Sequence, residues 1–157
     1  MIAAIVSGGQ TGVDRAALDA ALESGFPCGG WCPKGRRAED GPLAAKYPLR
    51  EAPVAAYPAR TARNVRDSDG TVVLLRGSPD RGTALTIALA EKARRPLLVL
   101  DLDAWTPADA ADQVLAWAEP AQIGVLNVAG PRESGQPGVY SQALAVLRHL
   151  LAAVRPA

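Results

Sequence analysis

The stretch IAAIVSGGQTGVD, residues 2–14, holds the features that decide the fold. Residues 2–6 form a short apolar run, which is typical of a strand buried on both faces of a parallel sheet. A glycine-rich turn follows at once, and small apolar residues then recur at helical spacing. Gly25 is suited to end that helix because it adopts the left-handed conformation without strain. We therefore predict a strand over 2–6, a tight turn, and a helix over 13–24.

The same alternation of strand and helix continues along the chain. Further strands are expected over residues 28–32, 71–75, 97–102 and 122–128, and further helices over 61–66, 82–92, 107–117 and 138–154. Strands that alternate with helices predict an α/β fold with a mostly parallel sheet and helices on both faces. The proline-rich stretch 33–59 shows little periodicity, so we expect a long, lid-like loop there.

The composition is that of an ordinary globular domain. Of 157 residues, 48% are hydrophobic and 21% are charged, and the formal net charge is +1. Proteins that bind nucleic acids or membrane surfaces through charge usually carry a large basic excess. We therefore expect one domain over 1–157 with no nucleic-acid or membrane partner. The apolar run at its start has no basic flank and is too short for a signal peptide, which predicts a cytoplasmic location.

Metal binding is not expected from this sequence. Cys28 and Cys32 are its two cysteines and His149 is its one histidine, whereas a structural zinc site needs four ligands. We expect the cysteines to be reduced structural thiols. His149 falls in the middle of the last predicted helix and is expected at its surface.

The loop after the first strand is the first candidate for a binding site. It consists of Ser7, Gly8, Gly9, Gln10, Thr11 and Gly12. Ligands of open α/β sheets bind beyond the carboxyl ends of the strands, and peptide N–H groups at a helix start favour an anion there. Thr11 is the expected N-cap, with Asp14 completing an arrangement like a capping box. The alternative is that the loop is only a tight turn before a well-capped helix.

Two further strands end in loops of the same kind, residues 76–83 and 127–135. The candidate contacts in them are Gly77, Ser78, Gly82, Thr83, Gly130, Arg132 and Ser134. Arg76 or Arg81 is suited to hold a phosphate through two parallel hydrogen bonds. No loop contains G-x-x-x-x-G-K-[ST], which excludes a P-loop NTPase. The first loop also lacks G-x-G-x-x-G, which disfavours ordinary dinucleotide binding.

Basic side chains near these loops are further candidates. Lys34 and Arg36 belong to a basic run in the long loop and are expected to close over an anion, unless the run is a solvated charge cluster. Arg60 and Asn64 are four residues apart on a short helix, so both can point to one ligand or simply decorate the surface. Trp31 is suited to stack on a base or a pterin ring.

Three segments resemble the putative molybdenum carrier family, also described as the circularly permuted YpsA-like branch of the SLOG superfamily. They are SGGQTGVDR at residues 7–15, CPKGRRAEDG at 32–41 and NVAGPRES at 127–134. The resemblance extends over nearly the whole chain. It implies a single-domain, Rossmann-like three-layer sandwich and a homo-oligomer. It also suggests a nucleotide or the molybdenum cofactor, a pterin bearing a phosphate (molybdopterin), as the ligand.

The wider superfamily includes LOG-type enzymes, which hydrolyse the N-glycosidic bond of nucleoside 5′-monophosphates and carry P-G-G-x-G-T-x-x-E. The segment GSPDRGT at residues 77–83 is similar up to Gly-Thr, but Thr86 stands where that family has glutamate. A hydroxyl cannot act as that carboxylate does. We therefore expect a binding or carrier protein. The alternatives are a hydrolase with Asp14 or Glu133 as its acid or base, or a nucleotide-ligand sensor.

Overall fold

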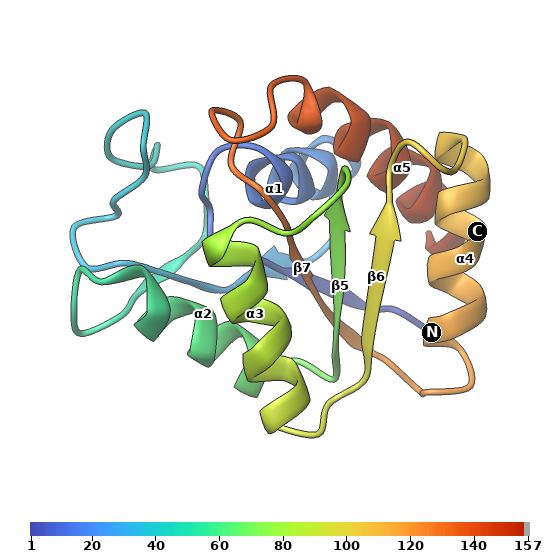
Figure 1. The fold of residues 1–157 in the computed structure, drawn as a ribbon, viewed down its shortest axis with the longest axis horizontal. Coiled ribbons are helices and arrows are strands. Elements are labelled where there is room, and N and C mark those ends of the chain that lie inside the picture. Colours follow the sequence, from blue (N-terminus) through green and yellow to red (C-terminus); the bar gives the residue numbers. More distant parts are fainter. Residues whose placement is uncertain (156–157) are drawn as a thin grey trace.

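The computed structural model describes residues 1–155 and contains a five-stranded parallel sheet (Figure 1). Its strand order is β2-β1-β7-β5-β6. The bounds are β1 Ala4–Val6, β2 Cys28–Gly29, β5 Gly70–Leu75, β6 Leu97–Asp101 and β7 Val125–Ala129. A separate parallel pair consists of β3, Trp31–Cys32, and β4, Arg50–Glu51. All five strands of this sheet are parallel, so their carboxyl ends lie at the same edge of the sheet.

Helices cover both faces of this sheet. They are α1 Val13–Ser24, α2 Tyr57–Arg66, α3 Arg81–Lys92, α4 Pro107–Ala118 and α5 Val139–Val154. Figure 1 shows α1, α4 and α5 on one side of the sheet and α2 with α3 on the other. The fold is thus the three-layer, Rossmann-like α/β arrangement expected from the sequence. No helix within residues 1–155 combines the length and apolarity needed to cross a membrane.

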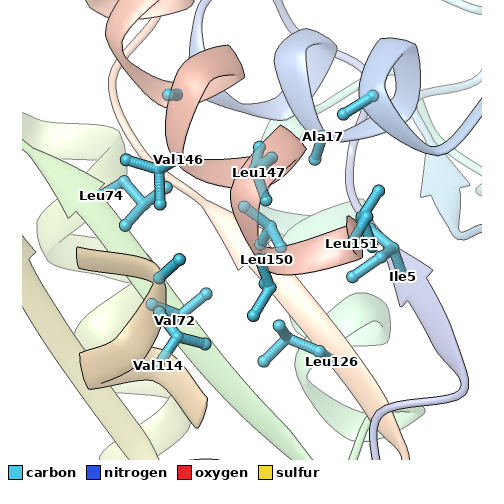
Figure 2. Packing of buried hydrophobic residues seen from close by; sticks show 14 of the residues in the cluster. Ile5, Ala17, Val72, Leu74, Val114, Leu126, Val146, Leu147, Leu150 and Leu151 are labelled. Atoms are coloured by element: carbon cyan, nitrogen blue, oxygen red, sulfur yellow. The ribbon is translucent and has the colours of Figure 1, made fainter. Parts of the chain in front are cut away.

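The main hydrophobic core lies between the sheet and the α1–α4–α5 layer (Figure 2). Alternate residues of the strands, such as Val72 and Leu74 on β5, point into it, because side chains of a strand alternate between its two faces. Leu147 and Leu150 of α5 meet them and are almost completely buried. Each such side chain stabilises the fold by roughly 1.5–3 kcal/mol. This layer fixes the strands whose carboxyl ends form the candidate site.

Most predicted elements are confirmed, and three details are wrong. The predicted strand over 28–32 is two strands in different sheets, because Gly30 has a φ of 129° and turns the chain between them. The N-cap of α1 is Gly12, without a side-chain hydrogen bond, and the Thr11 hydroxyl bonds to other loops. The predicted loop over 33–59 contains the short strand β4 and ends earlier, because α2 begins at Tyr57.

Candidate functional site

A cavity of about 370 Å³ lies at the carboxyl edge of the sheet, between α2 and the start of α3. Four segments line it, with residues drawn from 8–14, 57–64, 80–86 and 127–132. The first follows β1, the second belongs to α2, the third opens α3, and the fourth ends β7. Cavities of this size and position are typical of small-molecule sites in α/β proteins.

A buried ion pair forms part of the cavity wall. Nη1 of Arg60 donates to Oδ2 of Asp14 at 3.1 Å, and only 11% and 9% of the two side chains are exposed. The peptide N–H of Gln10 also donates to Oδ2, at 3.4 Å. Burial raises the pKa of the Asp14 carboxyl above its ordinary value, although Arg60 opposes that shift. The pair therefore places a carboxylate and a guanidinium together in a poorly solvated site.

Gly8 makes room for this ion pair. A Cβ atom on Gly8 would lie 1.7 Å from Nη1 of Arg60 and 2.6 Å from its Cζ. The guanidinium thus packs directly on the backbone of the first glycine loop, in the space that a Cβ at this position would occupy. The glycine that the sequence predicted as a ligand contact therefore lines the cavity and also positions Arg60.

Unpartnered polar atoms concentrate around the cavity. Within residues 1–155, four buried side-chain polar atoms have no hydrogen-bond partner: Nε2 of Gln10, Nε of Arg60, Oγ1 of Thr83 and Oε1 of Gln142. The first three belong to residues that line the cavity. Buried polar groups in native proteins are nearly always paired, so an unpaired one calls for an explanation. Three of the four atoms thus belong to residues of the cavity wall, and Gln142 lies outside it.

The start of α3 contributes a helix N-terminus. Asp80 is its N-cap, and its carboxylate accepts a hydrogen bond from the Thr83 peptide N–H at 2.7 Å. Arg81 and Gly82 occupy the next positions and line the cavity, where the first N–H groups of a helix have no acceptor within the helix. Thr86 also faces the cavity, with its hydroxyl bonded to the Gly82 carbonyl at 3.2 Å. Threonine thus occupies a cavity position where the LOG-type motif has glutamate.

Ser7, Gly9 and Gly12 of the first loop make structural contacts and do not line this cavity. The Ser7 hydroxyl donates to the backbone carbonyl of Asp14 at 2.8 Å. A Cβ on Gly9 would lie 2.7 Å from Leu49, and a Cβ on Gly12 would lie 2.3 Å from the Pro131 carbonyl oxygen. A bulkier residue at either glycine would disturb the fold, so substituting them cannot isolate an effect on binding.

The third loop divides between the cavity and structural contacts. Gly130 and Arg132 line the cavity, whereas Ser134 bonds to Glu39 of the long loop. Glu133 accepts hydrogen bonds from the peptide N–H groups of Gly138 and Tyr140, at the start of α5. Of the two proposed acid–base residues, only Asp14 therefore lines the cavity.

Four remaining candidates lie outside the cavity lining. They are Gly77, Ser78, Lys34 and Arg36. The guanidinium of Arg36 donates to four backbone carbonyls, those of Leu43, Ala44, Tyr47 and Leu49. Arg36 therefore holds the long loop in shape. Arg76 likewise donates to the Pro137 carbonyl at 2.6 Å.

Trp31 and Asn64 are tied to each other. The Asn64 amide exchanges two hydrogen bonds with the Trp31 backbone, at 2.8 and 3.0 Å, although Asn64 still lines the cavity. The guanidiniums of Arg50 and Arg63 lie 4.4 and 5.4 Å from the Trp31 ring centre, and the indole N–H donates to Asp67 at 2.9 Å. It lies outside the cavity lining, so its predicted stacking on a ligand has no support from the geometry.

Sequence reasoning missed Tyr57 and Asn127. Tyr57 lines the cavity, and the guanidiniums of Arg60 and Arg132 lie 5.5 and 5.7 Å from its ring centre. No local pattern marks Tyr57, because the predicted helix began four residues later. Asn127 is buried in the middle of β7, and its amide donates to the Thr71 hydroxyl at 3.2 Å. A polar residue in an otherwise apolar strand was the available signal.

The thiols show no sign of activation. Burial raises the pKa of both Cys28 and Cys32 above the ordinary value, whereas reactive thiols have a lowered pKa. Over residues 1–155, no group of three or more His, Cys, Asp or Glu side chains is placed to hold a metal ion. His149 is exposed on α5 as expected.

Comparison with known proteins agrees with the fold and the motifs. The model of the circularly permutated YpsA SLOG family matches residues 5–151. A solved structure of a putative molybdenum carrier protein from Syntrophus aciditrophicus SB is 45% identical in sequence, with a TM-score of 0.93. That match covers 96% of this chain and 95% of the other. No curated protein matches the chain. The chain therefore belongs to the circularly permutated YpsA family of SLOG proteins.

Proposed function

We propose that the cavity binds a small phosphorylated molecule, either a nucleotide or a phosphorylated pterin such as molybdopterin. The observation that carries this proposal is the set of three buried, unpartnered polar atoms on Gln10, Arg60 and Thr83. Leaving such an atom unpaired costs about 1–3 kcal/mol, which a ligand with matching donors and acceptors would offset. The chain would then act as a carrier or binding protein.

Charge in the cavity supports an anionic ligand. Arg60, Arg81 and Arg132 line it, against the carboxylates of Asp14 and Asp80. Both carboxylates already have partners, since Asp14 pairs with Arg60 and Asp80 caps α3. Arg81 is therefore the cation most available to a phosphate, together with the N–H groups at the start of α3, whereas Arg132 lies 3.7 Å from the Glu39 carboxylate.

The name of the similar bacterial protein suggests a cargo related to molybdenum. The pterin of a molybdenum cofactor offers several ring donors and acceptors as well as a phosphate, which suits the mixed polar wall of this cavity. A nucleotide offers the same two features. The homo-oligomer and the cytoplasmic location expected from the sequence stay predictions.

Thr83 allows a sharp test of the proposal. Thr83→Val removes an unpartnered hydroxyl from a residue that is 3% exposed, so the free energy of unfolding should stay the same or rise. Nucleoside 5′-monophosphates or molybdopterin should bind about tenfold or more weakly, because a hydrogen bond to a charged group is lost. Titration calorimetry measures the affinity, and thermal unfolding measures the stability.

Thr83→Ser is the matched control, because it keeps the hydroxyl and should bind as the wild type does. Equal affinities of the valine and serine variants would show that the Thr83 hydroxyl does not contact the ligand. Absence of binding by the wild-type chain to nucleotides, molybdopterin and inorganic phosphate would overturn the proposal as a whole.

A second candidate function is hydrolysis of a nucleoside 5′-monophosphate to its free base and ribose 5-phosphate. The observation that favours it is the environment of Asp14, whose carboxyl lines the cavity and has its pKa raised by burial. Carboxyl groups with a raised pKa serve as general acids in enzymes. Chromatography of incubated nucleotides would detect released base. Release that Asp14→Asn abolishes, with binding retained, would identify a hydrolase; no release would leave a binding protein.

A further inference from the structure

The Glu39 carboxylate accepts hydrogen bonds from residues of the first and the third glycine loops. Its Oε1 accepts hydrogen bonds from Oγ1 of Thr11 at 2.6 Å and from the peptide N–H of Ser134 at 3.2 Å. Its Oε2 accepts one from the Ser134 hydroxyl at 2.7 Å. Nη1 of Arg132 lies 3.7 Å from Oε2. A carboxylate from the long loop is therefore held by groups from two separate loops.

These donors are the kinds that proteins use to hold a phosphate. Hydroxyls, peptide N–H groups and arginine guanidiniums form most contacts to phosphate oxygens. Partial burial raises the pKa of Glu39, but the hydrogen bonds from Thr11 and Ser134 outweigh it, so the pKa lies below its ordinary value. The donors thus stabilise negative charge at this position.

The same donors are connected to the cavity. Arg132 lines the cavity while it faces Glu39. Gln10 also lines the cavity, and its Oε1 accepts the peptide N–H of Glu39 at 2.8 Å while its Nε2 is unpartnered. An anion bound in the cavity therefore lies next to residues that contact Glu39, and a ligand large enough to reach Arg132 meets this carboxylate.

We propose that Thr11, Arg132 and Ser134 form a subsite for a tetrahedral oxyanion, and that Glu39 occupies it as an internal mimic until the phosphate of the ligand displaces it. This inference rests on the proposed function, since the phosphate belongs to the ligand of the cavity. Displacement needs a rotation of the Glu39 side chain, which is 21% exposed at the surface. Glu39 would then weaken binding of free phosphate and favour ligands that also fill the cavity.

Glu39→Ala tests the subsite with inorganic phosphate as the probe, at constant ionic strength so that screening does not differ between samples. The variant should bind phosphate about tenfold more tightly than the wild type, because a competing charge-assisted contact is removed. Glu39→Ala combined with Ser134→Ala should lose this gain. Glu39→Gln, with the same size and no charge, replaces Glu39→Ala should that variant fold poorly, with the same expectation.

Asp40→Ala is the matched control. Asp40 is the next residue of the same loop, and its exposed ion pair with Arg15 does not involve the subsite. It should leave phosphate binding as in the wild type. An equal gain in Asp40→Ala, no gain in Glu39→Ala, or a gain that survives loss of Ser134 would overturn the inference. Nucleotide binding that depends on Thr83 would meanwhile stand, so failure of the subsite and failure of the cavity are distinguishable.

Discussion

At the scale of single residues, the Asp14–Arg60 pair shows how the site is built. Its two side chains are less exposed than those of the other ion pairs within residues 1–155. Burying two charges costs several kcal/mol per ion, and their attraction repays this only with good geometry and additional hydrogen bonds. Gly8 supplies the space, and the Gln10 N–H supplies an additional donor. Removing one charge therefore leaves the other unpaired in a poorly solvated place.

Arg60→Met should lower the free energy of unfolding by about 3–5 kcal/mol, because it leaves the buried Asp14 carboxylate without its partner. Adding Asp14→Asn should recover part of this loss, since the amide carries no charge. Arg66→Met is the matched control: Arg66 pairs with Asp67 at the surface, where such pairs contribute little to stability. Urea unfolding of the variants measures the differences. Similar losses for Arg60→Met and Arg66→Met would contradict the claim that Asp14 depends on Arg60 because it is buried.

At the scale of elements, the close approach of the first and third loops shapes the carboxyl edge of the sheet. Gly12 at the start of α1 lies against the chain at Pro131, whose carbonyl accepts the Val13 N–H at 3.2 Å. A Cβ on Gly12 would lie 2.3 Å from that carbonyl oxygen. Backbone atoms there cannot move aside as a flexible side chain can, so the two loops require a glycine at this contact.

Gly12→Ala should destabilise the protein more than Gly35→Ala. Both glycines have a positive φ, +78° and +85°, which strains a residue with a side chain at either position. Nothing lies within 4 Å of a Cβ on Gly35, whereas Gly12 is crowded. Overpacking should add about 1–3 kcal/mol to the loss at Gly12. Thermal or urea unfolding measures both variants, and equal losses would contradict the crowding argument.

Local sequence patterns were sufficient for most elements. The bounds of α1 match the prediction, because the spacing of its small apolar residues and Gly25 are local signals. The division of residues 28–32 between two sheets was not predictable, since the partners of β2 and β3 lie far away in the chain. The capping prediction failed for the same reason, because Thr11 bonds to Glu39 and Glu133.

The candidate site was predictable as a set of loops but not atom by atom. Glycine-rich segments after β1, β5 and β7 lie at the edge of the sheet where the cavity is found. Sequence alone could not separate Gly8, which lines the cavity, from Gly9, which packs against leucines. Arg36 looked like an anion contact, yet its guanidinium is used by backbone carbonyls of its own loop. Such distinctions depend on contacts between distant segments.

At the scale of the whole molecule, the strand order places the cavity. The chain passes from β1 to β2 on one side, whereas β7, β5 and β6 lie on the other. Connections diverge at such a point, and the crevice beyond the carboxyl ends is where open α/β sheets bind ligands. The α1–α4–α5 layer holds the strands from one face, while α2 and α3 form the walls of the cavity on the other. The fold thus brings four distant segments to one small volume.

Hydrogen–deuterium exchange of the full chain, with and without saturating nucleoside 5′-monophosphate or molybdopterin, tests the central claim most directly. Ligands that bind the folded state protect the segments they contact and order. We predict added protection in residues 8–14, 57–64, 80–86 and 127–132, and little change in α4 or β6. Protection confined to other segments, or none with any of these compounds, would contradict the assignment of this cavity as the binding site.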